Sequence, residues 1–133
     1  MIKVNYLAIL KVILACLLIF SLPAIETMAR GSGNKVAYSG QIVATAFNSL
    51  EGQTDSTPWI TASGTRCREG VIASNFLPMG TKVLIEGFGN RIFTVEDRMN
   101  RRYTKRIDIW FRHYSEARNF GIRKVKYYVL ASN

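Results

Sequence analysis

The sequence predicts a small, mainly β protein: a β-barrel of six short strands with one short helix. Short runs of β-branched and aromatic residues recur from residue 36 to the end of the chain, and turns rich in Gly, Pro or Asn separate them. Only one segment carries both a start and a stop signal for a helix. A closed barrel also leaves no strand edge exposed to other chains.

The strands are expected where apolar or alternating runs meet turn residues. The first run is the longest, and a polar segment, 48–59, follows it. Two later runs flank the sequence Gly-Phe-Gly-Asn, which is typical of a hairpin turn. The expected strands are residues 36–47, 70–74, two strands within 76–97, 106–111 and 124–130.

The single helix is expected at residues 115–121. Ser115 can cap its N-terminus, and Gly121 can stop it. Between them, Ala117 and Phe120 supply an apolar edge that can face the barrel. This segment is too short to change the prediction of a mainly β domain.

The N-terminal region differs from the rest of the chain. Its apolar run, Val12–Ile25, is shorter than a membrane span and typical of a signal peptide. Small residues at Thr27 and Ala29 predict cleavage after Ala29 and export to the periplasm, cell wall or extracellular space; an uncleaved N-terminal anchor is the alternative. The chain then divides into a signal peptide (1–29), a lead-in with the start of the first strand (30–43) and the barrel domain (44–133).

The chain is strongly basic, with a formal net charge of +9 at pH 7. Residues 1–29 hold two Lys and one Glu, so removing them leaves 16 cations and 8 anions. Such a charge suits anionic cell-wall polymers, anionic lipid surfaces or nucleic acid. Export disfavours nucleic acid, and we expect membrane contact only through the signal peptide or an anchor.

The sequence predicts neither a metal nor a cofactor. His113 is the single histidine, and the chain has no Cys/His cluster and no phosphate-binding loop. Cys67 is the one cysteine after the signal peptide, so no intramolecular disulfide is expected and the residue reads as a small buried hydrophobe. We expect the protein to be a monomer.

A carboxyl and an indole share one face of the expected strand 106–111, because side chains alternate between the two faces. The core face carries Ile107, Ile109 and Phe111, and the other face carries Arg106, Asp108 and Trp110. This face suits a carbohydrate, since a sugar ring can lie on Trp110 while Asp108 reaches a glycosidic oxygen. The alternative is structural: Trp110 covers the barrel rim, and Asp108 pairs with a neighbouring arginine.

Asp97 ends the preceding strand. Alternation places it on the apolar face with Phe93 and Val95, while Glu96 points the other way. An unpaired buried charge is costly, so Asp97 must meet a cation or hydrogen-bond donors, lie at an open end of the barrel, or cap the next turn. Two acids close in space with different environments suit general acid chemistry.

The stretch from Ala44 to Leu130 resembles the 3D domain, a family named for three aspartates. The resemblance rests on "LPMGTKV", a strand ending in Asp97, "RIDIWF" with Asp108 eleven residues later, a helix carrying "EA" and "FG", and the final "YYVL". The same core occurs in membrane-bound lytic transglycosylase A and in muralytic stationary-phase survival proteins. Rare lipoprotein A and the expansins are more distantly similar.

The resemblance implies a double-psi β-barrel whose acids line a glycan groove. It also implies cleavage of the β-1,4 bond between N-acetylmuramic acid and N-acetylglucosamine without water, with closure of an anhydro ring. By position, Asp108 matches the acid-base and Asp97 the supporting aspartate. The expected substrate-binding residues are Ser63, Asn75, Arg106 and Trp110, and the expected partner is the glycan strand of peptidoglycan.

The sequence departs from the family at its first aspartate. Asn75 stands after "GVIAS" where the family usually has Asp, and "RMNRR" replaces a Gly pair after the second aspartate. An amide keeps the hydrogen-bonding ability but loses the charge, and without that charge the pKa of Asp108 would be lower. The alternative function is therefore a non-catalytic wall-binding module, as in expansins.

Overall fold

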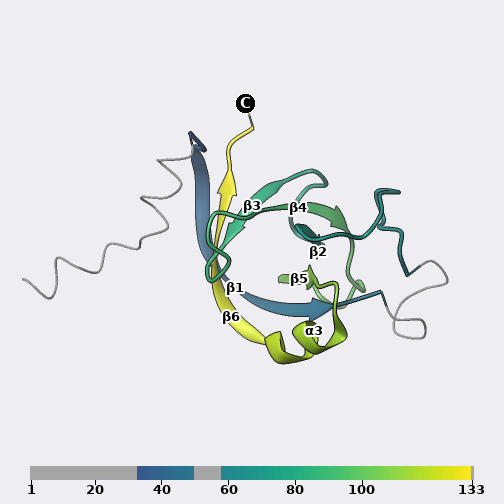
Figure 1. Cartoon of the computed structure of the whole chain (residues 1–133). Coiled ribbons are helices and arrows are strands. Elements are labelled where there is room, and N and C mark those ends of the chain that lie inside the picture. Colours follow the sequence, from purple (N-terminus) through teal and green to yellow (C-terminus); the bar gives the residue numbers. More distant parts are fainter. Residues whose placement is uncertain (1–32, 50–57, 133) are drawn as a thin grey trace, which may run out of the picture.

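The computed structural model describes residues 33–49 and 58–132 of the chain (Figure 1). These residues form β1 (Val36–Phe47), β2 (Val71–Ser74), β3 (Lys82–Ile85), β4 (Ile92–Asp97), β5 (Arg106–Trp110), α3 (Tyr114–Phe120) and β6 (Arg123–Leu130). The signal peptide expected at residues 1–29 lies outside them. Among the described residues, no helix is both long enough and apolar enough to cross a membrane.

The strands close into one barrel in the order β1-β5-β2-β4-β3-β6 (Figure 1). Neighbours are parallel in two pairs, β1 with β5 and β2 with β4, and antiparallel in the others. Parallel neighbours cannot be joined by a tight turn, so longer connections must cross between strands. The prediction of a six-stranded β-barrel with one short helix is confirmed.

The long first strand joins two parts of the barrel wall. Its first part pairs with β6 and its last part with β5. At Gly40, a Cβ would lie 3.1 Å from the ring of Tyr127, so a side chain there would displace that ring. The strand residues before Ala44 are therefore part of the closed barrel.

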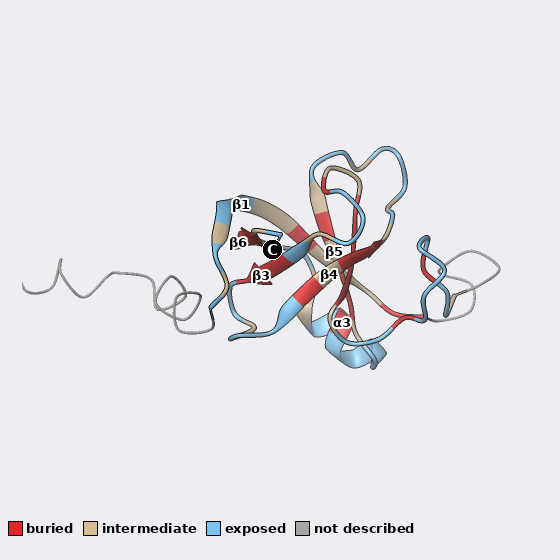
Figure 2. Cartoon of the chain, turned by 90° about the horizontal axis from the view of Figure 1, so that it is seen from above, coloured by how far each residue is buried: buried red, intermediate tan, exposed pale blue. Residues whose placement is uncertain are grey.

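The core lies inside the barrel and is built from alternating residues of every strand (Figure 2). Ile107 and Ile109 are fully buried there, as alternation along β5 predicts. Phe88 packs edge-to-face on Phe93, with ring centroids 5.1 Å apart, and it also contacts Phe120 of α3. The helix thus packs against the barrel through aromatic contacts.

The helix begins slightly earlier than the sequence predicts. His113, and not Ser115, is the N-cap residue, and its backbone N–H donates to Glu116 Oε2 over 3.4 Å. The stop at Gly121 is confirmed, since this residue has a φ of 61°, a conformation that favours glycine.

Candidate functional site

The two aspartates flank one small residue of β2. Ala73 pairs with Asp97 on β4 and with Asp108 on β5, so the three residues lie at the same level of the barrel wall. Directly paired residues of neighbouring strands share a face of the sheet. Ala73 itself is buried.

A register shift brings Asp97 to this position. Along the β2–β4 pair, Ile72 is opposite Val95, but the next residue, Ala73, is opposite Asp97. Glu96 is therefore an extra residue, as in a β-bulge. Strict alternation would have put Asp97 in the core beside Val95, so the expected face of Asp97 is wrong and the bulge is the reason.

Asp108 is half-buried, and the pKa of its carboxyl is raised. Burial raises its pKa most, and the negative charge of Asp97 raises it further. A hydrogen bond of 2.7 Å from Thr45 Oγ1 to Asp108 Oδ1 and the charge of Arg106 act in the opposite direction, but burial prevails. Asp108 therefore holds a proton to higher pH than an exposed aspartate.

Asp97 is held by hydrogen-bond donors of the backbone. The N–H groups of Ala62 and Arg98 both donate to Asp97 Oδ1, over 2.9 and 2.8 Å. These two bonds hold the Asp97 side chain against the backbone of two different segments. The pair thus combines a carboxyl whose pKa is raised with a carboxyl that accepts two backbone hydrogen bonds.

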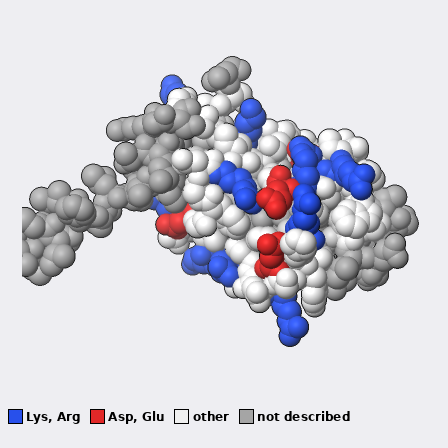
Figure 3. Space-filling view, in the orientation of Figure 1, with Lys and Arg blue, Asp and Glu red and all other residues white. Residues whose placement is uncertain are grey.

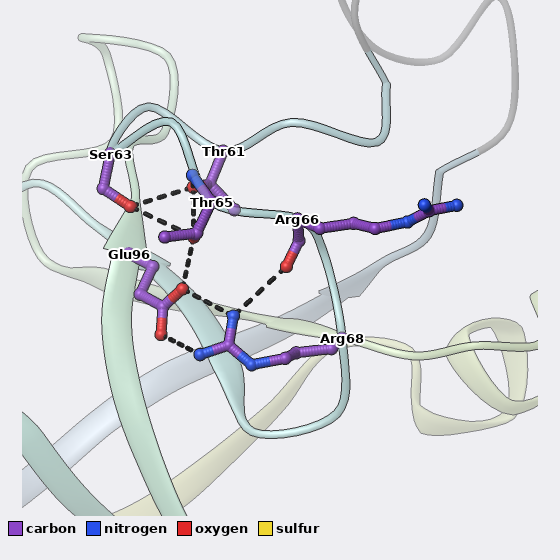
Figure 4. Close-up of polar contacts among 6 residues, drawn as sticks. All are labelled: Thr61, Ser63, Thr65, Arg66, Arg68 and Glu96. Carbon is purple, nitrogen blue, oxygen red and sulfur yellow. Dashed lines mark hydrogen bonds and ion pairs between the residues drawn. The ribbon is translucent and has the colours of Figure 1, made fainter.

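The Ala62 donor belongs to the turn Thr61–Thr65, which is fixed by polar contacts (Figure 4). Glu96 is 8% exposed; it forms a two-pronged ion pair with Arg68, with N–O distances of 2.5 and 2.8 Å, and accepts a hydrogen bond from Thr65 Oγ1. The Arg68 guanidinium lowers the pKa of Glu96. The bulge residue therefore anchors the turn that holds Asp97.

Ser63 lies on this turn, close to the acids in the fold. Its backbone N–H donates to the carbonyl oxygen of Glu96 over 3.0 Å, and its exposed hydroxyl lies 2.9 Å from Thr61 Oγ1. The structure thus brings Ser63 to the same edge of the barrel as Asp97. Its side chain is accessible to a ligand.

Asn75 has a structural role that the sequence did not reveal. Its Nδ2 lies 3.0 to 3.1 Å from the carbonyl oxygens of Met99, Asn100 and Tyr103, and its Oδ1 accepts from the Met99 N–H. Its donor and acceptor groups thus face the chain's own backbone. Asn75 stabilises the connection between β4 and β5 through these hydrogen bonds.

Arg106 lies beside the acids but forms no ion pair with them. Its guanidinium carbon is 4.8 Å from the centre of the Tyr103 ring, and its charge lowers the pKa of Asp108. Neither of the two ion pairs between described residues includes Asp108. The charge of Arg106 therefore limits the rise in the pKa of Asp108, but the two side chains form no ion pair.

The expectation of Trp110 as a sugar platform is wrong. Its side chain is 5% exposed, packs with Cys67 and Val71, and donates from Nε1 to Ser49 Oγ over 3.0 Å. Trp110 does lie on the face of β5 opposite the core, but residues from distant segments cover it. Cys67 is buried in this outer cluster, as expected.

Three relevant residues were missed by sequence reasoning. Thr45 reaches Asp108 through the parallel β1–β5 register, which no local pattern predicts. Glu96 is the bulge residue, and it bonds to Arg68 and Thr65 of the neighbouring segment. Trp59 is a third candidate only by its exposure of 47%, on the segment that carries the Thr61–Thr65 turn, and its signal in the sequence was an aromatic residue in a polar region.

Comparisons with known proteins add no family to this geometry. No protein-family model matches the chain, and no curated protein matches it.

Proposed function

We propose that the protein is an exported lytic transglycosylase that cleaves the glycan strands of peptidoglycan. The observation that carries the proposal is the acid pair. Asp108 is half-buried and has a raised pKa, and the hydrogen-bonded Asp97 lies on the other side of the strand β2, where Ala73 pairs with both acids. A single carboxyl group that can give and retake a proton is what this reaction needs.

In the proposed reaction, Asp108 donates its proton to the oxygen that links N-acetylmuramic acid to N-acetylglucosamine. The bond from C1 of the muramyl residue to this oxygen breaks, and the leaving sugar departs with a free 4-hydroxyl. The muramyl 6-hydroxyl then bonds to C1, and its proton passes to the Asp108 carboxylate. The carboxyl is restored, no water is consumed, and the product carries a 1,6-anhydro ring.

The surrounding residues support this chemistry in distinct ways. The negative charge of Asp97 favours the protonated form of Asp108 before the reaction, and it can stabilise positive charge that develops at C1. Thr45 orients the Asp108 carboxyl through Oδ1. For sugar contact, the exposed hydroxyl of Ser63 and the exposed ring of Trp59 replace the buried Trp110 in this proposal.

Mass spectrometry of purified peptidoglycan after incubation with the protein tests the proposal. We expect anhydromuramyl fragments, and a loss of about 100-fold or more in their rate of release with Asp108→Asn, the scale of general acid-base catalysis. Glu69→Gln, a change at an exposed acid, is the matched control and should keep full activity.

Two results would contradict the proposal. Fragments with free reducing ends would mean that water attacks C1, which excludes ring closure. Unchanged release by a folded Asp108→Asn variant would remove the assignment of the acid.

A non-catalytic wall-binding module is the second candidate. Asn75 favours it, because the position of the family's first acid is occupied by an amide that only fastens the backbone. Sedimentation with purified walls beside a turbidity assay separates the candidates: binding without clearing, and without anhydromuramyl fragments, supports the module.

A further inference from the structure

The connection between β4 and β5, residues 98–105, concentrates positive charge beside the acid pair. It begins directly after Asp97, ends close to Asp108, and carries Arg98, Arg101, Arg102 and Lys105 without an acid. Lys and Arg side chains are also prominent on the face seen in Figure 3. These cations differ in how far they are available to a ligand.

The cations nearest to the acids are engaged with the protein. The guanidinium of Arg98 donates to the carbonyl oxygens of Ser74 and Leu77, and that of Arg106 lies over the Tyr103 ring. The cations farther along the connection differ. Arg101, Arg102 and Lys105 are exposed and take part in neither of the ion pairs between described residues.

Two of the three exposed cations lie on a turn whose backbone is held by hydrogen bonds, and Lys105 follows that turn. Arg101 and Arg102 are its central residues, since the Tyr103 N–H donates to the Asn100 carbonyl oxygen over 2.9 Å. Asn100 Oδ1 accepts from the Arg102 N–H over 3.1 Å, and Asn75 holds three carbonyl oxygens of the same stretch. A ligand that binds here meets an ordered backbone, which lowers the entropic cost of binding.

We propose that this basic turn, residues 100–105, binds the carboxylates of the stem peptides attached to the glycan strand. The inference rests on the proposed function and specifies its substrate. The available positive charge of the protein lies at the turn and not at the acid pair. The anionic groups of the substrate that bind it must therefore lie away from the bond that is cleaved. Stem-peptide carboxylates fit, whereas the lactyl carboxyl beside the sugar is bound in an amide whenever a peptide is attached.

Wall binding by an inactive chain tests this inference. In an Asp108→Asn background, the variant Arg101→Gln/Lys105→Gln is compared with Arg118→Gln/Lys124→Gln, which removes the same charge from exposed positions on α3 and β6. Arg102 is left in place because it packs on Tyr103, 4.8 Å from the ring centre. Binding is measured by sedimentation at low and high salt with intact walls, with walls stripped of peptides by an amidase, and with chitin.

We expect the turn variant to bind intact walls about threefold to tenfold more weakly than the control variant, the scale of two solvent-exposed ion pairs. High salt should reduce the difference. On stripped walls and on chitin, the two variants should bind alike, because the peptide carboxylates are absent.

Equal binding of the two variants to intact walls would overturn the inference, as would an equal loss by the turn variant on stripped walls. Neither result affects the proposed function, which depends on the anhydromuramyl fragments. Binding of the unmodified chain to anionic lipid vesicles or to DNA, but not to walls, would also overturn the inference.

Discussion

Two segments flank the acid pair, and they are held in different ways. The segment 58–67, which contains the Thr61–Thr65 turn, is held by apolar packing of Cys67 on Trp110 and by the bond network of Glu96. The connection 98–105 is held by the uncharged amide of Asn75 and by the guanidinium of Arg98, both of which bond to backbone carbonyl oxygens. The first segment therefore depends on the hydrophobic effect and on pH, and the second depends on hydrogen bonds between side chains and the backbone.

The largest expected effect is the loss of the apolar anchor of the first segment. Trp110→Ala should lower the free energy of unfolding by about 3 to 5 kcal/mol, as truncation of a buried aromatic residue does. Thermal melts followed by circular dichroism measure it. Trp59→Ala is the matched control: Trp59 is 47% exposed, so its truncation should change stability by less than about 0.5 kcal/mol. Similar shifts in both variants would mean that Trp110 is not the anchor.

The second largest effect on stability is expected for the connection 98–105. Asn75→Asp should lower the free energy of unfolding by about 1 to 3 kcal/mol, because a carboxylate would face the carbonyl oxygens of Met99, Asn100 and Tyr103 with no proton to donate. Chemical denaturation at neutral pH measures it.

Asn100→Asp is the control for that change. Asn100 is exposed, and its Oδ1 accepts from the Arg102 N–H, a role that a carboxylate keeps. Its stability should stay close to that of the parent chain. If Asn75→Asp were equally harmless, the connection 98–105 would not depend on the Asn75 amide.

The smallest expected effect is the pH-dependent contribution of Glu96, which holds the first segment but not the second. The pKa of Glu96 is lowered in the fold, so its pairing with Arg68 stabilises the protein above the pKa of an unfolded glutamate. That contribution is lost as the pH falls through the folded pKa. Glu96→Gln should therefore cost about 1 kcal/mol at neutral pH, since Arg68 is largely exposed, and almost nothing in strong acid.

Melting curves of the parent and the Glu96→Gln chain across this pH range provide the measurement. Glu69→Gln breaks the more exposed pair with Arg91, 3.3 Å apart, and should leave the curve unchanged. A cost of Glu96→Gln that persists in strong acid would show that charge is not what Glu96 contributes.

Most strand positions and the residues of the core could be predicted from the sequence alone. A high content of β-branched and aromatic residues predicted the strand β1 with its bounds at Val36 and Phe47, and alternation along β5 placed Ile107 and Ile109 inside the barrel. Gly121 marked the end of the helix. These features are local: they depend on backbone geometry and on the side chains of one segment, so neighbouring residues suffice to predict them.

Only the tertiary structure decided which polar residues form the site. The bulge at Glu96 turned Asp97 away from the core, the parallel β1–β5 register brought Thr45 to Asp108, and a distant segment covered Trp110. Each of these depends on residues far apart in the sequence. Alternation tells which face a side chain occupies, but what covers that face, and which strand lies beside it, depends on how the barrel closes.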